Sequence, residues 1–237
     1  MGYFIKALRI REELNDENGI SHVYNNMTRV FTYPEDYDRA IEYSQKSLEM
    51  LRKMDDPIAV GSAHIALGAI YMNKKDYDQV LAMFSAAEEI YTKAGLKDYK
   101  SWAQVKSVTA LNAQGKYQKA LDVGIEVMNS IGVHTDLFSM IKLYETFGAI
   151  YTNLGMPELA SEYLHKARRF ADEGNDSNGR INARLKLSEM FRAFKNMTLP
   201  GIIETNTSLC EMRYLVLKSP GRLQRSNNCT RQKKRIN

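Results

Sequence analysis

Four histidines, two cysteines and a single tryptophan are the residues of this chain whose chemistry could support catalysis, metal binding or ligand anchoring. The histidines are scattered along the sequence as His22, His64, His134 and His165. Nucleophilic catalysis needs a nucleophile, a base and an orienting group held together. None of the four histidines has such partners at a consistent spacing, so the sequence predicts no enzyme.

The cysteines and the motif content give no sign of a metal or a cofactor. Cys210 and Cys229 both lie near the C-terminus, and neither has a histidine or a second cysteine at metal-binding spacing. The pattern is typical of reduced cytosolic thiols. Glycine-rich phosphate loops and the His-Glu-x-x-His metal motif are both missing from the sequence. We therefore expect no metal and no cofactor.

Charge is unevenly distributed along the chain. The formal net charge is +5, but residues 201–237 carry eight basic and two acidic residues, so the remainder is close to neutral. A case for nucleic acid therefore rests on the basic run Arg231–Arg235 alone, and a solvated terminus is the simpler interpretation. No apolar run approaches the roughly 18 residues that span a bilayer, and no secretion signal is visible. We expect a cytoplasmic protein that binds neither nucleic acid nor membrane.

The elements that would position any binding residue repeat every 40 residues. Small or β-branched residues recur at this spacing, as do the tyrosines and proline three residues before them: Ala40, Val80, Ala120 and Ala160 follow Tyr37, Tyr77, Tyr117 and Pro157. A fixed period in this range indicates a stacked-repeat architecture. Most tyrosines keep such fixed positions, which favours a packing role over a nucleic-acid stacking surface.

Each 40-residue unit is predicted to be a pair of antiparallel helices. In one unit, apolar residues at helical spacing predict helices over Ile58–Met72 and Tyr77–Tyr91, joined by a short polar link. Gly68 and Gly148 fall where the first helix of a pair must let the second approach closely. His64 stands at a position where other units carry tyrosine, so we expect it to pack between helices.

The repeat resembles the tetratricopeptide repeat (TPR) family. The resemblance is carried by Leu67-Gly68-Ala69-Ile70-Tyr71 with Tyr77, Phe84 and Ala87, and by Phe147-Gly148-Ala149-Ile150-Tyr151 with Pro157, Ala160 and Ala167. It implies an all-α, right-handed superhelical solenoid that binds proteins or peptides. The commonest TPR period is about 34 residues. Units as long as these are similar to bacterial TPR regions that accompany sensor kinases and transcription regulators.

The repeat pattern breaks at both ends of the chain. Tyr3–Leu14 matches a second helix only, so the chain is expected to begin inside a longer array or to use this helix as a cap. The position where a fifth second helix needs a small residue is Pro200, which disfavours a helix. The predicted array covers residues 1–198, and a basic tail covers residues 199–237. This tail is expected to be disordered, or to be non-native as the product of a truncated or shifted reading frame. Within the array we predict a half repeat at 3–19, full repeats at about 20–57, 58–97, 98–137 and 138–177, and a lone first helix at 180–195.

The first helices of a TPR solenoid line its concave face, and this resemblance selects the candidate partner-binding residues. Trp102 lies at an inward position with Lys106 one turn away, where an exposed aromatic ring would anchor a partner; packing against the adjacent repeat is the open alternative. The full set is Asn25, Arg29, Met72, Asn73, Trp102, Lys106, Thr109, Asn112, Lys142, Glu145, Asn153 and Arg192. We predict a scaffold that binds a peptide or protein segment in this groove. The alternative is a sensory or oligomerisation segment of a larger bacterial signal-transduction protein, with self-association through the open repeat ends.

Overall fold

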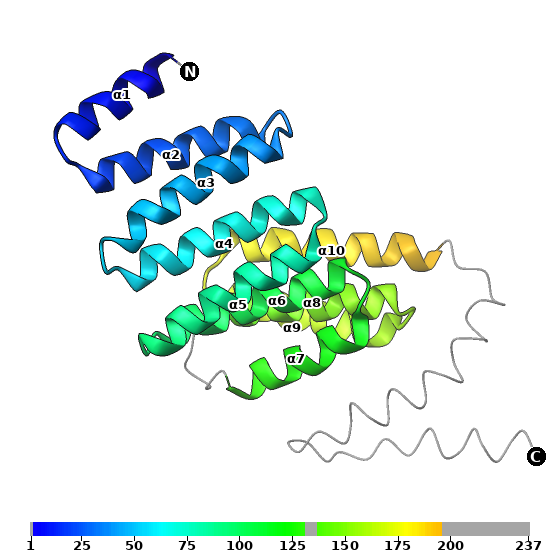
Figure 1. Cartoon of the computed structure of the whole chain (residues 1–237). Coiled ribbons are helices and arrows are strands. Elements are labelled where there is room, and N and C mark those ends of the chain that lie inside the picture. The colour runs from blue at the N-terminus through cyan, green and yellow to red at the C-terminus, as the bar shows by residue number, and fades with distance from the viewer. Residues whose placement is uncertain (1, 131–136, 196–237) are drawn as a thin grey trace, which may run out of the picture.

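The computed structural model describes residues 2–130 and 137–195, which form ten α-helices packed in sequential antiparallel pairs (Figure 1). In chain order they are α1 (Gly2–Glu13), α2 (Glu17–Thr32), α3 (Tyr37–Arg52), α4 (Pro57–Lys74), α5 (Tyr77–Lys93), α6 (Lys97–Ala113), α7 (Tyr117–Ser130), α8 (Leu137–Asn153), α9 (Pro157–Glu173) and α10 (Ser177–Lys195). The expected all-α, TPR-like solenoid is confirmed. The division into an array up to residue 198 and a tail stays a prediction, because residues 196–237 lie outside the described ones.

The helix junctions share one backbone design that recurs every 20 residues. Within the described residues, a residue with positive φ stands two positions before α2 to α7, α9 and α10, and at Gly95, Gly115 and Gly155 this conformation carries no Cβ penalty. Asn15, Glu35, Asp55, Lys75 and Asn175 adopt it as well. At most of these junctions the next amide donates back to the carbonyl five residues earlier, a bond that closes a helix C-terminus. The 40-residue period is therefore two similar 20-residue units.

Aspartates at the same spacing start several of the helices. The carboxylate of Asp16 accepts from the Gly19 amide at 2.8 Å, and that of Asp56 accepts from the amides of Ile58 and Ala59. Asp36 and Asp76 cap α3 and α5 in the same way. Each such cap satisfies an amide that the helix itself leaves unpaired. These aspartates therefore mark the points in the sequence where the helices begin.

Close approach within a helix pair depends on the predicted glycines. A Cβ on Gly68 would lie 2.4 Å from Cε1 of Phe84, and one on Gly148 would lie 2.5 Å from Cδ2 of Leu164. The small-residue position on the second helices, represented by Ala40, is fully buried. The expectation that these positions permit close packing is confirmed.

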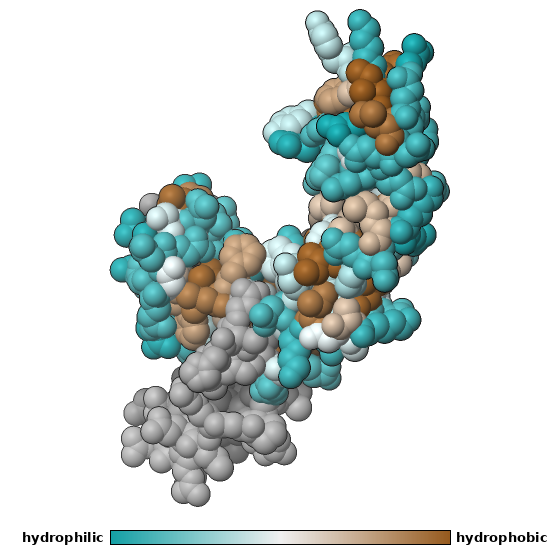
Figure 2. All heavy atoms as spheres, turned by 90° about the vertical axis from the view of Figure 1, so that its left-hand side faces the viewer, coloured by the Kyte–Doolittle hydropathy of each residue, from teal (hydrophilic) through white to brown (hydrophobic). Residues whose placement is uncertain are grey.

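The pairs curve with their first helices on the inner side. α8 packs against both α6 and α10, whereas successive second helices make at most marginal contact within the described residues. The helices on the shorter, inner path are therefore α6, α8 and α10. Figure 2 shows the body bending around an open hollow. In the N-terminal half, α4 and α6 contact each other only slightly, and α2 and α4 hardly at all.

Candidate binding groove

The inner side of α6 and α8 carries an aromatic contact at one end. The rings of Trp102 on α6 and Phe138 on α8 lie 4.9 Å apart between centroids. The ammonium of Lys106 lies 4.3 Å from the centre of the Trp102 ring. Trp102 thus packs on the adjacent repeat and is half-buried, while 45% of Phe138 is exposed. The two interpretations of Trp102 are compatible, because a ring fixed by one neighbour still presents an edge or a face to a partner.

Two lysines lie next to this aromatic pair, Lys106 on α6 and Lys142 on α8. We call the line of side chains that starts at Trp102 and Phe138 and runs along α6 and α8 the central row. Burial, and secondarily the nearby cation of Lys142, hold the pKa of the Lys106 ammonium below its ordinary value. Lys142 donates to Glu145 Oε2 at 2.8 Å, and its ammonium also lies 5.8 Å from the Phe138 ring centre. Among the described residues, Lys106 has no carboxylate within ion-pair distance. The site therefore holds one lysine, Lys142, whose charge is neutralised by Glu145. Beside it lies a second lysine, Lys106, whose ammonium could bind an acceptor group of a partner.

Glu145 differs from what its sequence position suggests. The prediction placed it on the groove surface, but only 3% of the residue is exposed. Its Oε1 atom is buried and has no hydrogen-bond partner within the described residues. Glu145 lies on α8, a helix that packs against α6, α9 and α10. Glu145 thus affects the groove by binding the ammonium of Lys142 and fixing its position.

Polar pairs complete the row toward the C-terminal ends of both helices. The hydroxyls of Thr109 and Thr146 lie 3.2 Å apart, and Asn153 Nδ2 donates to Asn112 Oδ1 at 3.3 Å. Thr146 was not among the predicted residues, although it shares its repeat position with Lys106, so the register alone could have found it. Phe138 was also missed, and no repeat signal marks it.

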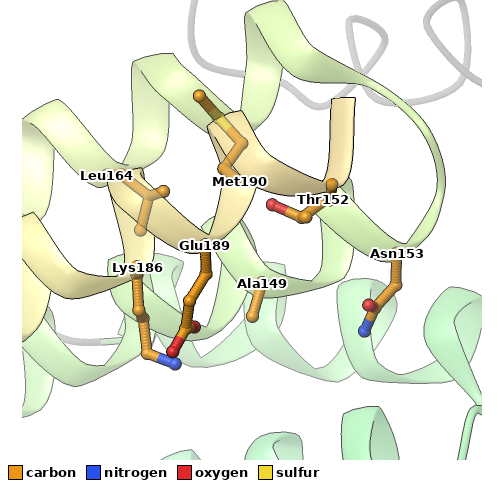
Figure 3. Close-up of a pocket in the computed structure, with 8 residues that line it drawn as sticks. Ala149, Thr152, Asn153, Leu164, Lys186, Glu189 and Met190 are labelled. Carbon is orange, nitrogen blue, oxygen red and sulfur yellow. The ribbon is translucent and has the colours of Figure 1, made fainter. Parts of the chain in front are cut away.

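A small cleft between α8 and α10 extends the row. Its volume is about 210 Å³, large enough for a side chain. Leu164 on α9 and Met190 on α10 are apolar residues of its lining, while Lys186 and Glu189 extend from α10 beside it (Figure 3). Asn153 lies at its edge and so links the cleft to the row on α6 and α8.

The remaining predicted residues are not brought into this row. Asn25 and Arg29 are exposed on α2, and Asn73 is exposed near the end of α4. Met72 packs against the buried cluster formed by α4, α5 and α6, which gives it a structural role. Arg192 is exposed near the end of α10. Because α4 contacts α6 only slightly and α2 hardly contacts α4, the shared repeat position does not make a shared surface.

His64 lies in a second, separate cleft between α3, α4 and α5. The residue is 6% exposed, so its predicted packing between helices is confirmed. Its Nδ1 atom is buried without a hydrogen-bond partner in the described part of the chain. Burial, and secondarily the charge of Arg52, hold the pKa of the imidazole below its ordinary value. The cleft has a volume of about 390 Å³ and is also lined by Gln45 and Glu49.

Neither candidate metal sites nor membrane-spanning elements are found in residues 2–130 and 137–195. These residues hold no group of three or more His, Cys, Asp or Glu side chains arranged to bind a metal. Within the same ranges, no helix is both long and apolar enough to cross a bilayer.

Comparison with known protein families gives one clear match. The model of the family described as soluble NSF attachment protein, SNAP, matches residues 2–176, which is most of the chain. A search among curated proteins finds no significant match.

Solved structures with the same fold are distant in sequence. BtubC (BKLC) from P. vanneervenii is 12% identical, with a TM-score of 0.63 over 95% of this chain and 92% of its own. Aspartyl phosphate phosphatase F from Bacillus subtilis is 16% identical, with a TM-score of 0.68 over 91% of this chain but 56% of its own. A Rap protein complexed with competence and sporulation factor is 17% identical, with a TM-score of 0.62 over 84% of this chain and 58% of its own. The chain thus spans little more than half the length of the last two proteins.

Proposed function

Because the chain belongs to the soluble NSF attachment protein family, we propose that it is a scaffold that binds a peptide or protein segment along the inner side of α6, α8 and α10. TPR-like repeat domains are generally protein-binding scaffolds, and those of this family are typically non-catalytic. The groove would act by recognition, without chemistry of its own. A cytoplasmic location belongs to the same proposal.

The observation that carries the proposal is the continuous row of side chains on α6 and α8. The aromatic pair Trp102 and Phe138 offers an apolar anchor, and aromatic anchors commonly dominate the energy of an interface. Lys106 offers a cation that no carboxylate in the described residues neutralises. Asn112 and Asn153 offer amide groups that suit the backbone of an extended segment. The side-chain groups that a partner would meet along the groove are thus first apolar, then cationic and then amide.

The exposed residues on α2 and α4 extend the proposal to a longer partner. A segment that continues past α6 toward the N-terminus would meet Asn73 on α4 and then Asn25 and Arg29 on α2. A segment that continues the other way would reach the cleft beside Met190 and then Arg192. These residues are expected to contribute less, because they do not contact the central row.

A selection from a phage-displayed library of random peptides, made on the immobilised full chain, tests the proposal. The affinity of the selected peptides is measured by fluorescence anisotropy for wild type and for Trp102→Ala. The matched control is Lys166→Ala on α9, which removes a lysine from the face of Tyr163 on a second helix. We expect at least tenfold weaker binding for Trp102→Ala, about 1.4 kcal/mol, and no change for the control. Equal affinity for all three proteins would remove the central row from the binding site.

A second candidate function is that of a sensory or oligomerisation segment within a larger bacterial signal-transduction protein, such as a sensor kinase or a transcription regulator. The exposed apolar faces at the two ends of the array, on α1 and α10, favour it. The fold is also shared with a Rap protein that binds competence and sporulation factor. Measuring the mass of the chain in solution separates oligomerisation from a purely monomeric scaffold.

A further inference from the structure

We propose that the chain associates with a second copy of itself head to tail, with α1 of one copy seated on α10 of the other as the second helix that α10 lacks in the described structure. The inference is independent of the groove, because it rests on the faces at the two ends of the array. Two residues are said here to share a phase when their numbers differ by a multiple of 40.

α1 has the phase of a second helix but lacks the burial of one. The residues that share a phase with Ala7 are Ser47, Ala87, Val127 and Ala167, and none is more than 2% exposed. Ala7 itself is only half-buried. On the same side of α1, Tyr3 is 89% exposed and Ile10 is 55% exposed. α1 therefore carries a contact face with nothing packed on it in the described structure.

α10 shows the complementary situation. Ile181 is 54% exposed, although Ile141, which shares its phase on α8, is only 1% exposed. Phe191 is 63% exposed, whereas Tyr151 at the same phase is 2% exposed. Tyr151 is covered by Tyr163 of α9, and within the described residues no helix takes the place of α9 on α10.

A pair of rings that recurs inside the array defines how the two faces would meet. Phe31 on α2 stacks on Tyr43 of α3 with centroids 5.4 Å apart. Tyr151 on α8 stacks in the same way on Tyr163 of α9, at 5.3 Å. Phe191 has the phase of the first partner, and Tyr3 has the phase of the second. Tyr3 of one copy would thus stack on Phe191 of the other.

Two neighbouring positions fit the same arrangement. Tyr144 contacts Tyr163 at 6.0 Å, and the residue that shares its phase on α10 is Arg184. A guanidinium at this place would lie over the Tyr3 ring, a favourable cation–π contact. Ser47 donates to the carbonyl of Ser21 at 3.1 Å, which brings the phases of Ala7 and Ile181 into contact.

The predicted interface is heterologous and joins unlike faces. Each assembly would keep a free α1 at one end and a free α10 at the other, so it grows by continuing the solenoid. Figure 2 shows apolar surface at the upper end of the molecule, where α1 and α2 lie. The competing occupant is the chain's own segment after α10. There, Pro200 and Ile203 take the phases of Ala160 and Tyr163, and both lie outside the described residues.

The test uses the full chain and two variants, each of which blocks one face. Tyr3→Asp places a charge on the α1 face, and Phe191→Asp places one on the α10 face. Both residues are exposed, so neither change is expected to unfold the protein, and circular dichroism checks this. Tyr33→Asp is the matched control, because Tyr33 is 88% exposed at the end of α2 and belongs to neither face. Mass is measured by sedimentation equilibrium over a range of concentrations.

We expect the average mass of wild type and of Tyr33→Asp to rise with concentration above the 27.1 kDa of one chain. Each face variant alone should stay a monomer. An equimolar mixture of the two should form dimers and nothing larger. The α1 face of Phe191→Asp can bind the α10 face of Tyr3→Asp, and the two faces that then remain on the dimer are both blocked. A wild-type chain that stays monomeric at every concentration would overturn the proposal, as would association that both face variants retain. A mixture without dimers would exclude the α1–α10 pairing.

Discussion

The two halves of the array use one repeat differently. In the C-terminal half, α8 packs against both α6 and α10, and the buried apolar residues of α6 to α10 join into one large cluster. In the N-terminal half, neighbouring first helices hardly touch, and the core is divided into smaller clusters at the individual helix contacts. The same 40-residue period thus gives a C-terminal half with one continuous core and an N-terminal half whose core is divided.

The difference shows that a recognition surface depends on neighbours as well as on register. Glu145 and Thr146 on α8 are buried, and the Thr146 hydroxyl contacts Thr109 of α6, whereas Asn25 and Asn26, which share their phases on α2, are exposed. In a solenoid each repeat contacts only its neighbours, so stability and surface are set interface by interface. The C-terminal half is therefore expected to be the more stable and the better preorganised for binding.

The largest expected effect separates the cores of the two halves. Phe147→Ala removes a ring that is 1% exposed within the large cluster, and we expect a loss of about 3–5 kcal/mol in the free energy of unfolding. Phe31→Ala, in a small cluster and 6% exposed, should cost less, about 3 kcal/mol or below. Urea unfolding followed by circular dichroism measures both. Equal losses would contradict the contrast between the halves.

The next effect concerns binding and uses two asparagines that share a phase. Asn153 lies in the central row and bonds Asn112, whereas Asn73 is exposed on α4. We expect Asn153→Ala to weaken the selected peptides by about 1 kcal/mol, roughly fivefold, and Asn73→Ala to leave their affinity unchanged. Anisotropy titration of the same peptides compares the two. A loss confined to Asn73→Ala would move the site to the N-terminal half.

The sequence was sufficient to predict the fold because each helix depends on local signals that repeat. The predicted helix over Ile58–Met72 lies within the observed Pro57–Lys74, and the predicted glycine contacts are present. The burial of His64 followed from its phase as well. These features are set by neighbours within one helix pair, which a periodic pattern describes directly.

The groove was only partly predictable because its shape depends on how far apart successive first helices lie. Lys106 and Trp102 were correctly placed one turn apart, but the contact of the ammonium with the ring face was not predicted. The contacts of Thr109 with Thr146 and of Asn112 with Asn153 required the α6–α8 distance, which side-chain packing across several helices determines. Residues that share a phase were therefore predicted to be equally exposed, whereas the structure buries some of them and exposes others.

Alkaline pH should weaken the C-terminal half. Burial raises the pKa of the Tyr163 hydroxyl to about 12 and that of Tyr151 further still. An unfolded tyrosine ionises near about pH 10, so above that pH the unfolded state loses protons that the folded state keeps, and stability falls. Between about pH 9 and about pH 11 we expect Tyr163 to contribute a loss of about 1 kcal/mol.

Tyr163→Phe keeps the ring contact with Tyr151 and should make the alkaline decline shallower, as measured by urea unfolding at each pH. Tyr43→Phe is the matched control, because it has the same phase and also stacks on a first helix, but lies outside the large cluster. The explanation fails if Tyr163→Phe declines as steeply as wild type.

The smallest expected effect lies in the N-terminal half and has the opposite pH direction. Burial, and secondarily the charge of Arg52, lower the pKa of His64, while Glu49 and Gln45 line the same cleft. An unfolded histidine takes up a proton near about pH 6.5, whereas the folded one stays neutral to lower pH. Stability is therefore fully present above that value, falls as pH decreases toward the lowered folded pKa, and levels off below it.

His64→Gln removes the titrating group while keeping a polar side chain, and glutamine is the residue that the next repeat carries at this phase, in Gln104. We expect the variant to lose less stability than wild type between about pH 7 and about pH 5, above the range in which most carboxylates titrate. Urea unfolding at several pH values in that range measures the slope. Parallel slopes for the two proteins would assign the acid sensitivity to other groups. A shallower slope for His64→Gln would mean that acid destabilises the protein through the N-terminal half. Together with a shallower alkaline decline for Tyr163→Phe, it would show that acid acts on the N-terminal half and alkali on the C-terminal half, as the separate cores of the two halves require.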